Sequence, residues 1–148
     1  QRASRHPAPF ALASIDLDGF KAVNDNHGHA AGDALLKAFA ARLAAHRRGN
    51  DTVARLGGDE FALILEDVES AARAWPLCNA LCRILGAPYA LEVGGKTVEV
   101  TVGASIGAAR FEPGGEDPEG RLMRAADDAM YAAKHGGKNR CVLAPESG

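Results

Sequence analysis

Residues 52–65 read TVARLGGDEFALIL, two short apolar runs separated by a glycine pair and two acidic residues. Valine, leucine, isoleucine and phenylalanine favour strands, and glycine supplies the backbone freedom that a tight turn requires. The stretch therefore predicts an antiparallel β-hairpin with Asp59 and Glu60 on its tip. Because Gly57 and Gly58 carry no Cβ atoms, such a turn would also let a substrate lie against the backbone.

Hydrophobic periodicity on both sides of this hairpin predicts the remaining elements. Apolar runs predict strands, and apolar stripes at 3.6-residue spacing predict helices; one helix contains Pro76 and is therefore expected to start late or to kink. The predicted strands cover 10–17, 52–56, 61–65, 89–93, 96–102 and 140–143, the predicted helices about 31–47, 75–85 and 122–133, and the predicted loop 113–120. This order predicts an α/β fold in which helices flank a mixed, partly antiparallel central sheet.

The composition is that of one globular domain. The chain has 148 residues, of which 47% are hydrophobic and 24% charged, and its formal net charge is −2. This balance lacks the basic footprint of a nucleic-acid-binding protein and gives no attraction to an anionic membrane, and no apolar run is long enough to span a bilayer. Three cysteines are too few for a disulfide framework, so we expect a reducing, cytoplasmic environment.

Two acidic clusters lie at predicted strand ends. Asp16 and Asp18 close the first strand, and Asp59 and Glu60 form the hairpin tip. Carboxylates at the end of a buried strand are costly unless they are solvated, paired or bound to a cation. If the two strands are neighbours, Asp16 and Asp59 converge, and their hard oxygen atoms suit Mg²⁺ together with substrate phosphates. The alternative from spacing alone is two solvated acidic turns.

A polar segment follows the first strand, and a basic pair lies near the end of the last predicted helix. At 20–29, backbone amides lie where the strand opens into a helical turn, which favours phosphate. Asn24 and Asp33 carry groups that match a guanine edge, although such residues also cap turns. Lys134 and Lys138 lie one helical turn apart, so they either pair with phosphate or complement the helix dipole. The absence of a Walker loop and of a G-x-G-x-x-G segment excludes the common P-loop and Rossmann sites.

Three motifs occur in order along the chain: IDLDGFKAVND at 15–25, RLGGDEF at 55–61 and AADDAMYAAK at 125–134, the last followed by GKNR at 137–140. Together they resemble the GGDEF domain of the diguanylate cyclase family, and the match extends over about residues 10–142. The resemblance implies a fold similar to the palm of polymerases and nucleotidyl cyclases, which agrees with the mixed sheet predicted above.

The family condenses two GTP into cyclic di-GMP and releases two pyrophosphates. The resemblance therefore implies a nucleotidyltransferase that depends on Mg²⁺, with Mn²⁺ as an alternative ion, and that works as a homodimer. Asp59 and Glu60 would be catalytic, and the metal would be held by Asp16, the Leu17 carbonyl and Asp59. GTP would be bound by Phe20, Lys21, Asn24, Asp33, Gly57, Gly58, Lys134 and Lys138, the last of which stands where many relatives carry arginine.

The segment Arg48-Gly49-Asn50-Asp51 fits the family's RxxD pattern, through which these enzymes bind their product and are inhibited. From the sequence alone, its alternative is a solvated charge pair. For the whole chain, the alternative to an active cyclase is a catalytically silent regulatory module that binds GTP or cyclic di-GMP. The match also implies one GGDEF domain at 1–148 that lacks the family's usual N-terminal segment, and hence a piece of a longer protein with a flanking sensor or phosphodiesterase domain.

Overall fold

The computed structural model describes residues 8–111 and 120–145. Most of the predicted loop at 113–120 lies outside these residues. The elements follow one another as β1 (Phe10–Asp18), α1 (Phe20–His27), α2 (His29–Ala45), β2 (Thr52–Gly57), β3 (Glu60–Glu66), α3 (Ala71–Leu85), β4 (Tyr89–Val93), β5 (Lys96–Val100), β6 (Gly103–Phe111), α4 (Arg121–His135) and β7 (Arg140–Leu143).

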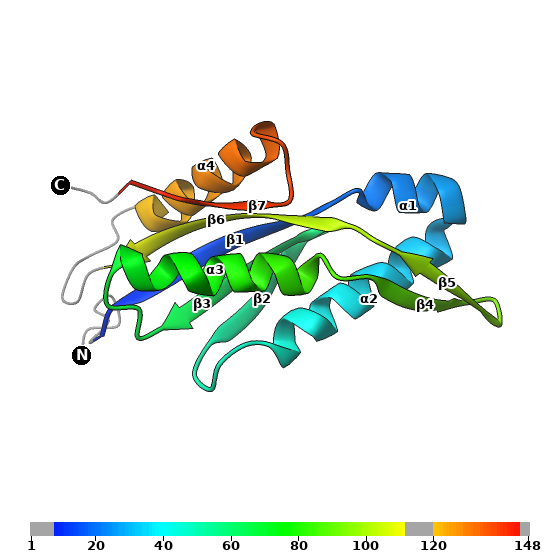
Figure 1. Ribbon diagram of the computed structural model, residues 1–148, viewed down its shortest axis with the longest axis horizontal. Coiled ribbons are helices and arrows are strands. Elements are labelled where there is room, and N and C mark those ends of the chain that lie inside the picture. Colours follow the sequence, from blue (N-terminus) through cyan, green and yellow to red (C-terminus); the bar gives the residue numbers. More distant parts are fainter. Residues whose placement is uncertain (1–7, 112–119, 146–148) are drawn as a thin grey trace.

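A five-stranded sheet in the order β2-β3-β1-β6-β7 forms the centre of the fold. Neighbouring strands are antiparallel except β6 and β7, which are parallel. Figure 1 shows α4 on one side of this sheet and α3 on the other, with α2 crossing beside α3. The predicted α/β class with a mixed, mostly antiparallel sheet flanked by helices is therefore confirmed. Strands β4 and β5 form a separate two-stranded sheet that extends away from the main one (Figure 1).

Alternation along β1 divides its side chains between the two faces of the sheet. Ile15 and Leu17 are buried in the core that α2 and α3 complete, where the ring of Phe39 packs against the neighbouring strand β3. Ser14 faces the other way, and its hydroxyl donates to Asp127 Oδ1 of α4 at 2.6 Å. One face of β1 is therefore apolar core, whereas the other presents polar side chains toward α4.

Strand β6 is an element that the sequence analysis missed. Most of its residues are glycine, alanine and serine, which have low strand propensity and show no hydrophobic alternation. These small residues leave room for a helix, because a Cβ atom at Gly107 would lie 2.0 Å from the backbone nitrogen of Met130 and 2.3 Å from the carbonyl oxygen of Ala126. The predicted strand at 96–102 is correspondingly too long, since β5 ends at Val100.

Two helices also begin earlier than predicted. The helix expected at about 31–47 begins at His29, and a separate helix, α1, precedes it where only a helical turn was expected. Helix α3 begins at Ala71, well before Pro76, because the hydroxyl of Ser70 caps its first turn by accepting from the Arg73 amide at 3.2 Å. The late start expected from Pro76 is therefore wrong.

Arg42 of α2 closes the C-terminal end of α3. Its guanidinium donates to the carbonyl oxygens of Ile84 at 3.2 Å, Ala87 at 2.7 Å and Pro88 at 2.8 Å. The same group lies 3.7 Å from the centre of the Tyr89 ring. One carbonyl group of the last turn of α3 and two of the loop that follows thus accept from a side chain of another helix.

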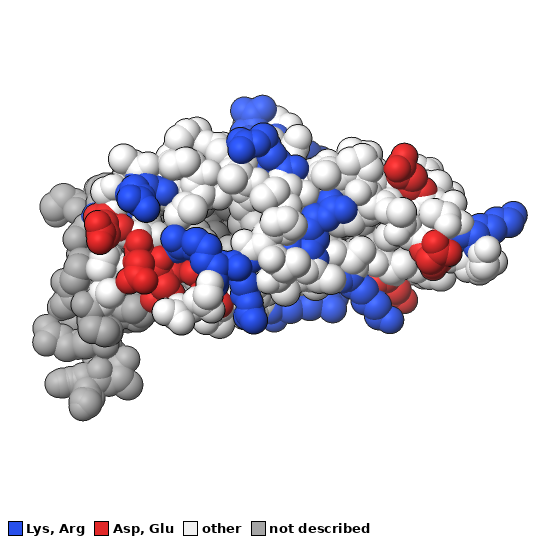
Figure 2. Space-filling view, turned by 60° about the horizontal axis from the view of Figure 1, so that its bottom comes forward, with Lys and Arg blue, Asp and Glu red and all other residues white. Residues whose placement is uncertain are grey.

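The surface agrees with the near-neutral composition. The face drawn in Figure 2 carries side chains of both signs, with the basic ones spread along its length rather than gathered into one patch. Within residues 8–111 and 120–145, no helix is both long enough and apolar enough to cross a membrane.

Candidate active site

The two predicted acidic clusters meet because β1 and β3 are neighbours in the sheet. Asp16 is the register partner of Glu60, and the Leu17 amide donates to the carbonyl oxygen of Asp59 at 3.1 Å. The end of β1 and the hairpin tip therefore form one continuous edge. The condition under which Asp16 and Asp59 were expected to converge is met.

Asp16 combines burial with an unsatisfied oxygen. It is only 8% exposed, and its Oδ2 accepts from the Lys134 ammonium at 2.8 Å. Its Oδ1 is buried and has no hydrogen-bond partner among the described residues. Burial raises the pKa of Asp16, and the negative charge of Asp59 adds to this effect although Lys134 opposes it. A buried carboxylate oxygen without a hydrogen-bond donor is unfavourable, and a nearby cation would stabilise it.

The charge on Glu60 is disfavoured as well. Partial burial raises the pKa of Glu60, and the negative charges of Asp16 and Asp127 raise it further. Carboxylates from β1, the hairpin tip and α4 thus repel one another in the absence of a cation. The described residues hold no group of three or more His, Cys, Asp or Glu side chains arranged for a metal. The donor set fits Mg²⁺ nonetheless, since this ion typically takes one or two carboxylates and completes its shell with water and substrate phosphates.

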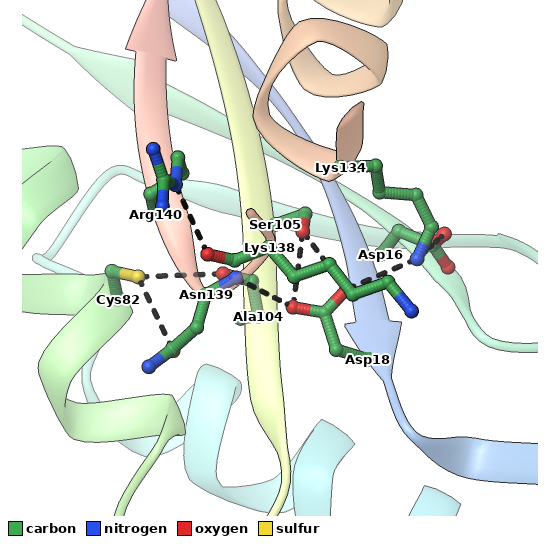
Figure 3. Close-up of polar contacts among 9 residues, drawn as sticks. All are labelled: Asp16, Asp18, Cys82, Ala104, Ser105, Lys134, Lys138, Asn139 and Arg140. Atoms are coloured by element: carbon green, nitrogen blue, oxygen red, sulfur yellow. Dashed lines mark hydrogen bonds and ion pairs between the residues drawn. The ribbon is translucent and has the colours of Figure 1, made fainter. Parts of the chain in front are cut away.

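Asp18 differs from Asp16 in having both oxygens occupied (Figure 3). Its Oδ1 accepts from the Ser105 hydroxyl at 2.8 Å and from the Lys134 ammonium at 3.0 Å. Its Oδ2 accepts from the backbone N–H of Asn139 at 2.8 Å and lies 3.0 Å from the same Ser105 hydroxyl. No separate role for Asp18 follows from the sequence alone, because its partners lie 87 or more residues along the chain.

The two candidate phosphate-binding lysines lie in different surroundings. Lys134 is half-buried; burial lowers its pKa, but its hydrogen bonds to Asp16 and Asp18 outweigh this effect, so the pKa is raised overall. It bridges α4 to the end of β1, which goes beyond complementing a helix dipole. Lys138 lies on the loop between α4 and β7, is exposed, and has a positive φ of 65°.

The glycine pair leaves the hairpin tip open. The φ angle is 156° at Gly57 and 46° at Gly58, and a Cβ atom at either position would meet nothing within 4 Å. The Arg55 guanidinium holds the turn by donating to the Gly58 carbonyl oxygen from Nε at 3.1 Å and from Nη2 at 2.7 Å. This contact was not predicted, although an arginine beside a glycine turn can be expected to donate to the exposed carbonyl groups of the turn.

Helices α1 and α2 bring the two candidate guanine-reading residues together. The side chain of Asn24 lies over Gly32, where a Cβ atom would come within 1.8 Å of Asn24 Oδ1. Asp33 follows Gly32 and is exposed. Phe20 and Lys21 form the first turn of α1, and the Lys21 ammonium pairs with the exposed Asp25 carboxylate at 3.1 Å.

The RxxD segment is an ordered structure that contains a partly buried charge pair between Arg48 and Asp51. Asp51 is only 4% exposed; its Oδ2 accepts from the Arg48 amide at 2.9 Å and Nε at 3.2 Å, and its Oδ1 accepts from the Glu66 amide at 2.8 Å. Arg48 also donates to the Glu66 carbonyl oxygen at the end of β3. Its side chain stays 40% exposed beside a surface hollow of about 240 Å³.

Comparison with known proteins identifies the fold and the motifs together. Residues 1–140 match the family described as diguanylate cyclase, GGDEF domain. The chain belongs to the GGDEF family. It is 46% identical over 139 residues to the bifunctional diguanylate cyclase/cyclic di-GMP phosphodiesterase MucR of Pseudomonas aeruginosa, a match that covers 94% of this chain and 19% of MucR. This GGDEF chain thus spans about a fifth of the length of that relative.

Solved GGDEF domains have the same architecture. The GGDEF domain of TpbB from Pseudomonas aeruginosa superposes with a TM-score of 0.80 at 38% identity, covering 93% of this chain and 78% of the other. The GGDEF domain of DgcB from Caulobacter crescentus, solved in complex with c-di-GMP, gives a TM-score of 0.77 at 30% identity, covering 91% and 77%. The predicted palm-like GGDEF fold is confirmed by these neighbours.

Proposed function

We propose that this chain is a Mg²⁺-dependent diguanylate cyclase that condenses two GTP into cyclic di-GMP and two pyrophosphates. The observation that carries the proposal is the buried Asp16 carboxylate, whose Oδ1 has no hydrogen-bond partner in the described part of the chain, beside the intact hairpin tip of Asp59 and Glu60. These carboxylates can be stabilised by a divalent cation that is bound together with a triphosphate.

In this proposal the acidic edge binds the metal and the reacting hydroxyl. Asp16, the Leu17 carbonyl and Asp59 hold Mg²⁺, with Mn²⁺ as a substitute, and Glu60 supports either the metal site or the hydroxyl group. When bound, the metal lowers the pKa of the attacking 3′-hydroxyl and neutralises the charge that develops on the α-phosphate. Lys134 already lies 3.0 Å from Asp18, so its ammonium is held at this edge, where it can also donate to a phosphate oxygen.

The other residues bind the remaining parts of GTP. Asn24 and Asp33 read the guanine edge, where their amide and carboxylate match its donors and acceptor. The triphosphate is bound by Phe20 through its backbone amide, by Lys21 and Lys138 through their ammonium groups, and by the open turn at Gly57 and Gly58. Lys21 exchanges Asp25 for phosphate, an exchange favoured because their ion pair is exposed and weak.

Ring closure requires two copies of the domain. The 3′-hydroxyl oxygen of each GTP attacks the α-phosphorus of the other, each new phosphodiester bond replaces one bond to pyrophosphate, and the two hydroxyl protons pass to solvent. Because one site holds one GTP, two sites must face each other, and a two-fold homodimer is the simplest arrangement that achieves this.

Product inhibition through Arg48 and Asp51 is part of the proposal. Asp51 and the Glu66 carbonyl oxygen hold the Arg48 guanidinium beside the surface hollow, where it would exchange part of these contacts for phosphate or a guanine edge. The c-di-GMP complex of the DgcB domain supports product binding within this family. We also propose that the chain acts in the cytoplasm as one domain, 1–148, of a longer protein with a flanking sensor or phosphodiesterase domain.

The proposal is tested by incubating the chain at high concentration with GTP and Mg²⁺ and separating the products by chromatography. Cyclic di-GMP is expected from the parent chain and from Asp128→Ala, which removes an exposed carboxylate of α4, but not from Asp59→Ala. A parallel sample carries a dimerising coiled coil at the N-terminus. Bound GTP without product in the dimerised form would instead identify a silent regulatory module.

A further inference from the structure

Asp18 is the most fully engaged carboxylate of the acidic edge. It is 6% exposed, and its two oxygens are surrounded by three donor groups: the Ser105 hydroxyl, the Lys134 ammonium and the backbone amide of Asn139. Asp16 lies two residues away on the same face of β1 and keeps one oxygen without a partner among the described residues. The two aspartates of this motif therefore differ in their ability to bind a cation. Asp16 has an oxygen available as a ligand, whereas both oxygens of Asp18 already accept hydrogen bonds.

The loop between α4 and β7 contains two consecutive non-glycine residues in the left-handed conformation. The φ angle is 65° at Lys138 and 48° at Asn139, a conformation that costs free energy for residues with side chains. Asp18 Oδ2 accepts a hydrogen bond from the backbone N–H of Asn139, which attaches the loop to the end of β1. The Lys138 amide is tied in turn to the carbonyl oxygen of Ala133 on α4 at 2.9 Å.

The side chain of Asn139 closes the other side of the loop. A Cβ atom at Gly103 would lie 2.8 Å from Asn139 Cβ, so the loop rests directly on the start of β6. Figure 3 shows Ser105 of β6, Lys134 of α4 and Asn139 of the loop converging on the Asp18 carboxylate. One side chain of β1 therefore joins three segments that are 87 or more residues away in sequence.

We infer that Asp18 is a positioning residue that fixes the Lys134 ammonium and the Lys138–Asn139 loop to the end of β1, so that both lysines meet the triphosphate already in place. The inference rests on the proposed function for the role of the two lysines, whereas the attachment of the loop stands on the contacts alone. Asp18 does not touch the substrate in this arrangement.

The test replaces Asp18 by asparagine in the 148-residue chain. Asparagine keeps the shape but has only one acceptor oxygen, so its amide nitrogen must face either the Lys134 ammonium or the Asn139 amide. Two quantities are measured: amide hydrogen exchange at 136–140, and the affinities for GMP and for the GTP analogue with a methylene bridge between its α- and β-phosphates. Each affinity is measured with Mg²⁺ and with chelator.

We expect Asp18→Asn to accelerate exchange at 136–140 and to weaken binding of the analogue by about tenfold, with and without Mg²⁺, while GMP affinity stays the same. Asp16→Asn serves as the matched variant on the same strand face. Its one remaining oxygen can keep the contact with Lys134, so this variant should lose mainly the Mg²⁺-dependent part of analogue binding. If Asp18→Asn does not fold, Ser105→Ala takes its place. This variant removes one donor to the Asp18 carboxylate and should show a smaller change of the same kind.

Unchanged exchange at 136–140 in both Asp18→Asn and Ser105→Ala would overturn the inference. Faster exchange with unchanged analogue affinity would also overturn it, because the loop would then be attached without positioning the lysines. If the parent chain binds the analogue no more tightly than GMP, the proposed function fails. The exchange rates at 136–140 would still decide whether Asp18 holds the loop.

Discussion

Asp16 and Glu60 lie directly opposite each other in the antiparallel ladder of β1 and β3. Residues that are opposite in such a ladder project from the same face of the sheet, so two carboxylates share one small region beside α4. Like charges in this position oppose each other, and both residues have raised pKa values, with burial as the first cause. The ionised forms of Asp16 and Glu60 are therefore disfavoured, and a bound cation would stabilise them.

Replacing Glu60 by glutamine is expected to stabilise the metal-free chain at neutral pH. The folded-state pKa of Glu60 lies above its ordinary value of 4.5, so its ionised form opposes folding. This penalty is present above the folded-state pKa and disappears as the pH falls below 4.5, where both states are protonated. The Tm of Glu60→Gln should therefore exceed that of the parent at pH 7 and match it at pH 4 and below.

Glu69→Gln is the control for this measurement, since Glu69 is exposed and lies outside the acidic edge. An equal rise in Tm for both variants would mean that general net charge, rather than the Asp16–Glu60 contact, causes the effect. Mg²⁺ added with nucleotide should reverse the order of the parent and Glu60→Gln, because bound ligand stabilises the parent in proportion to its affinity.

Replacing Arg48 by alanine is expected to weaken cyclic di-GMP binding while GTP binding persists. The guanidinium is the exposed donor of the hollow at the Glu66 end of β3, whereas the candidate GTP residues lie at the opposite end of the sheet edge. Calorimetric titration with each nucleotide measures the difference. Arg47→Ala, which removes the neighbouring exposed arginine, is the matched control, and product affinity that is unchanged in Arg48→Ala would remove this site from the proposal.

Replacing Gly107 by alanine is expected to destabilise the fold by roughly 1–3 kcal/mol or more, because the added Cβ must displace α4. Urea denaturation monitored by circular dichroism gives the change in unfolding free energy. Gly49→Ala is the control, since a Cβ atom there would meet nothing within 4 Å and its φ is not in the left-handed region. Similar losses at the two positions would contradict the direct contact between α4 and β6.

Replacing Arg42 by lysine is expected to cost roughly 1–2 kcal/mol of unfolding free energy, because a single ammonium nitrogen lacks the planar fork that reaches three separated carbonyl oxygens while it stacks on Tyr89. The same denaturation experiment measures this loss. Arg47→Lys changes an exposed arginine close by and should leave the stability unaltered. A loss below the experimental error in Arg42→Lys would show that solvent replaces the guanidinium without cost.

Periodicity was sufficient to predict the elements whose side chains alternate or form a stripe. It located β1, the β2–β3 hairpin and α4, because their burial follows from their own sequence. It missed β6, since the small residues of that strand reflect the helix backbone that lies on them. That requirement comes from tertiary packing and leaves no periodic trace in the sequence.

The candidate site was predictable to a similar extent. Spacing placed Asp16, Asp59 and Glu60 at strand ends that converge if the two strands are neighbours, and the pairing of β1 with β3 meets this condition. Spacing gave no means of separating Asp16 from Asp18, because the two residues are equivalent in strand period and differ only in their distant partners. The role of Arg55 could have been predicted from the sequence, since its partner is the carbonyl oxygen of a glycine three residues away.

The direct contact of α4 with β6 limits how this domain can respond to a signal. A helix whose backbone rests on a strand, with no side chain between them at Gly107, has no layer in which to slide or rotate. Lys134 is therefore carried by a helix that rests directly on the sheet, and its ammonium lies 2.8 Å from Asp16 Oδ2 at the end of β1. Any change in the position of α4 over Gly107 would have to separate the backbone of the helix from that of the strand.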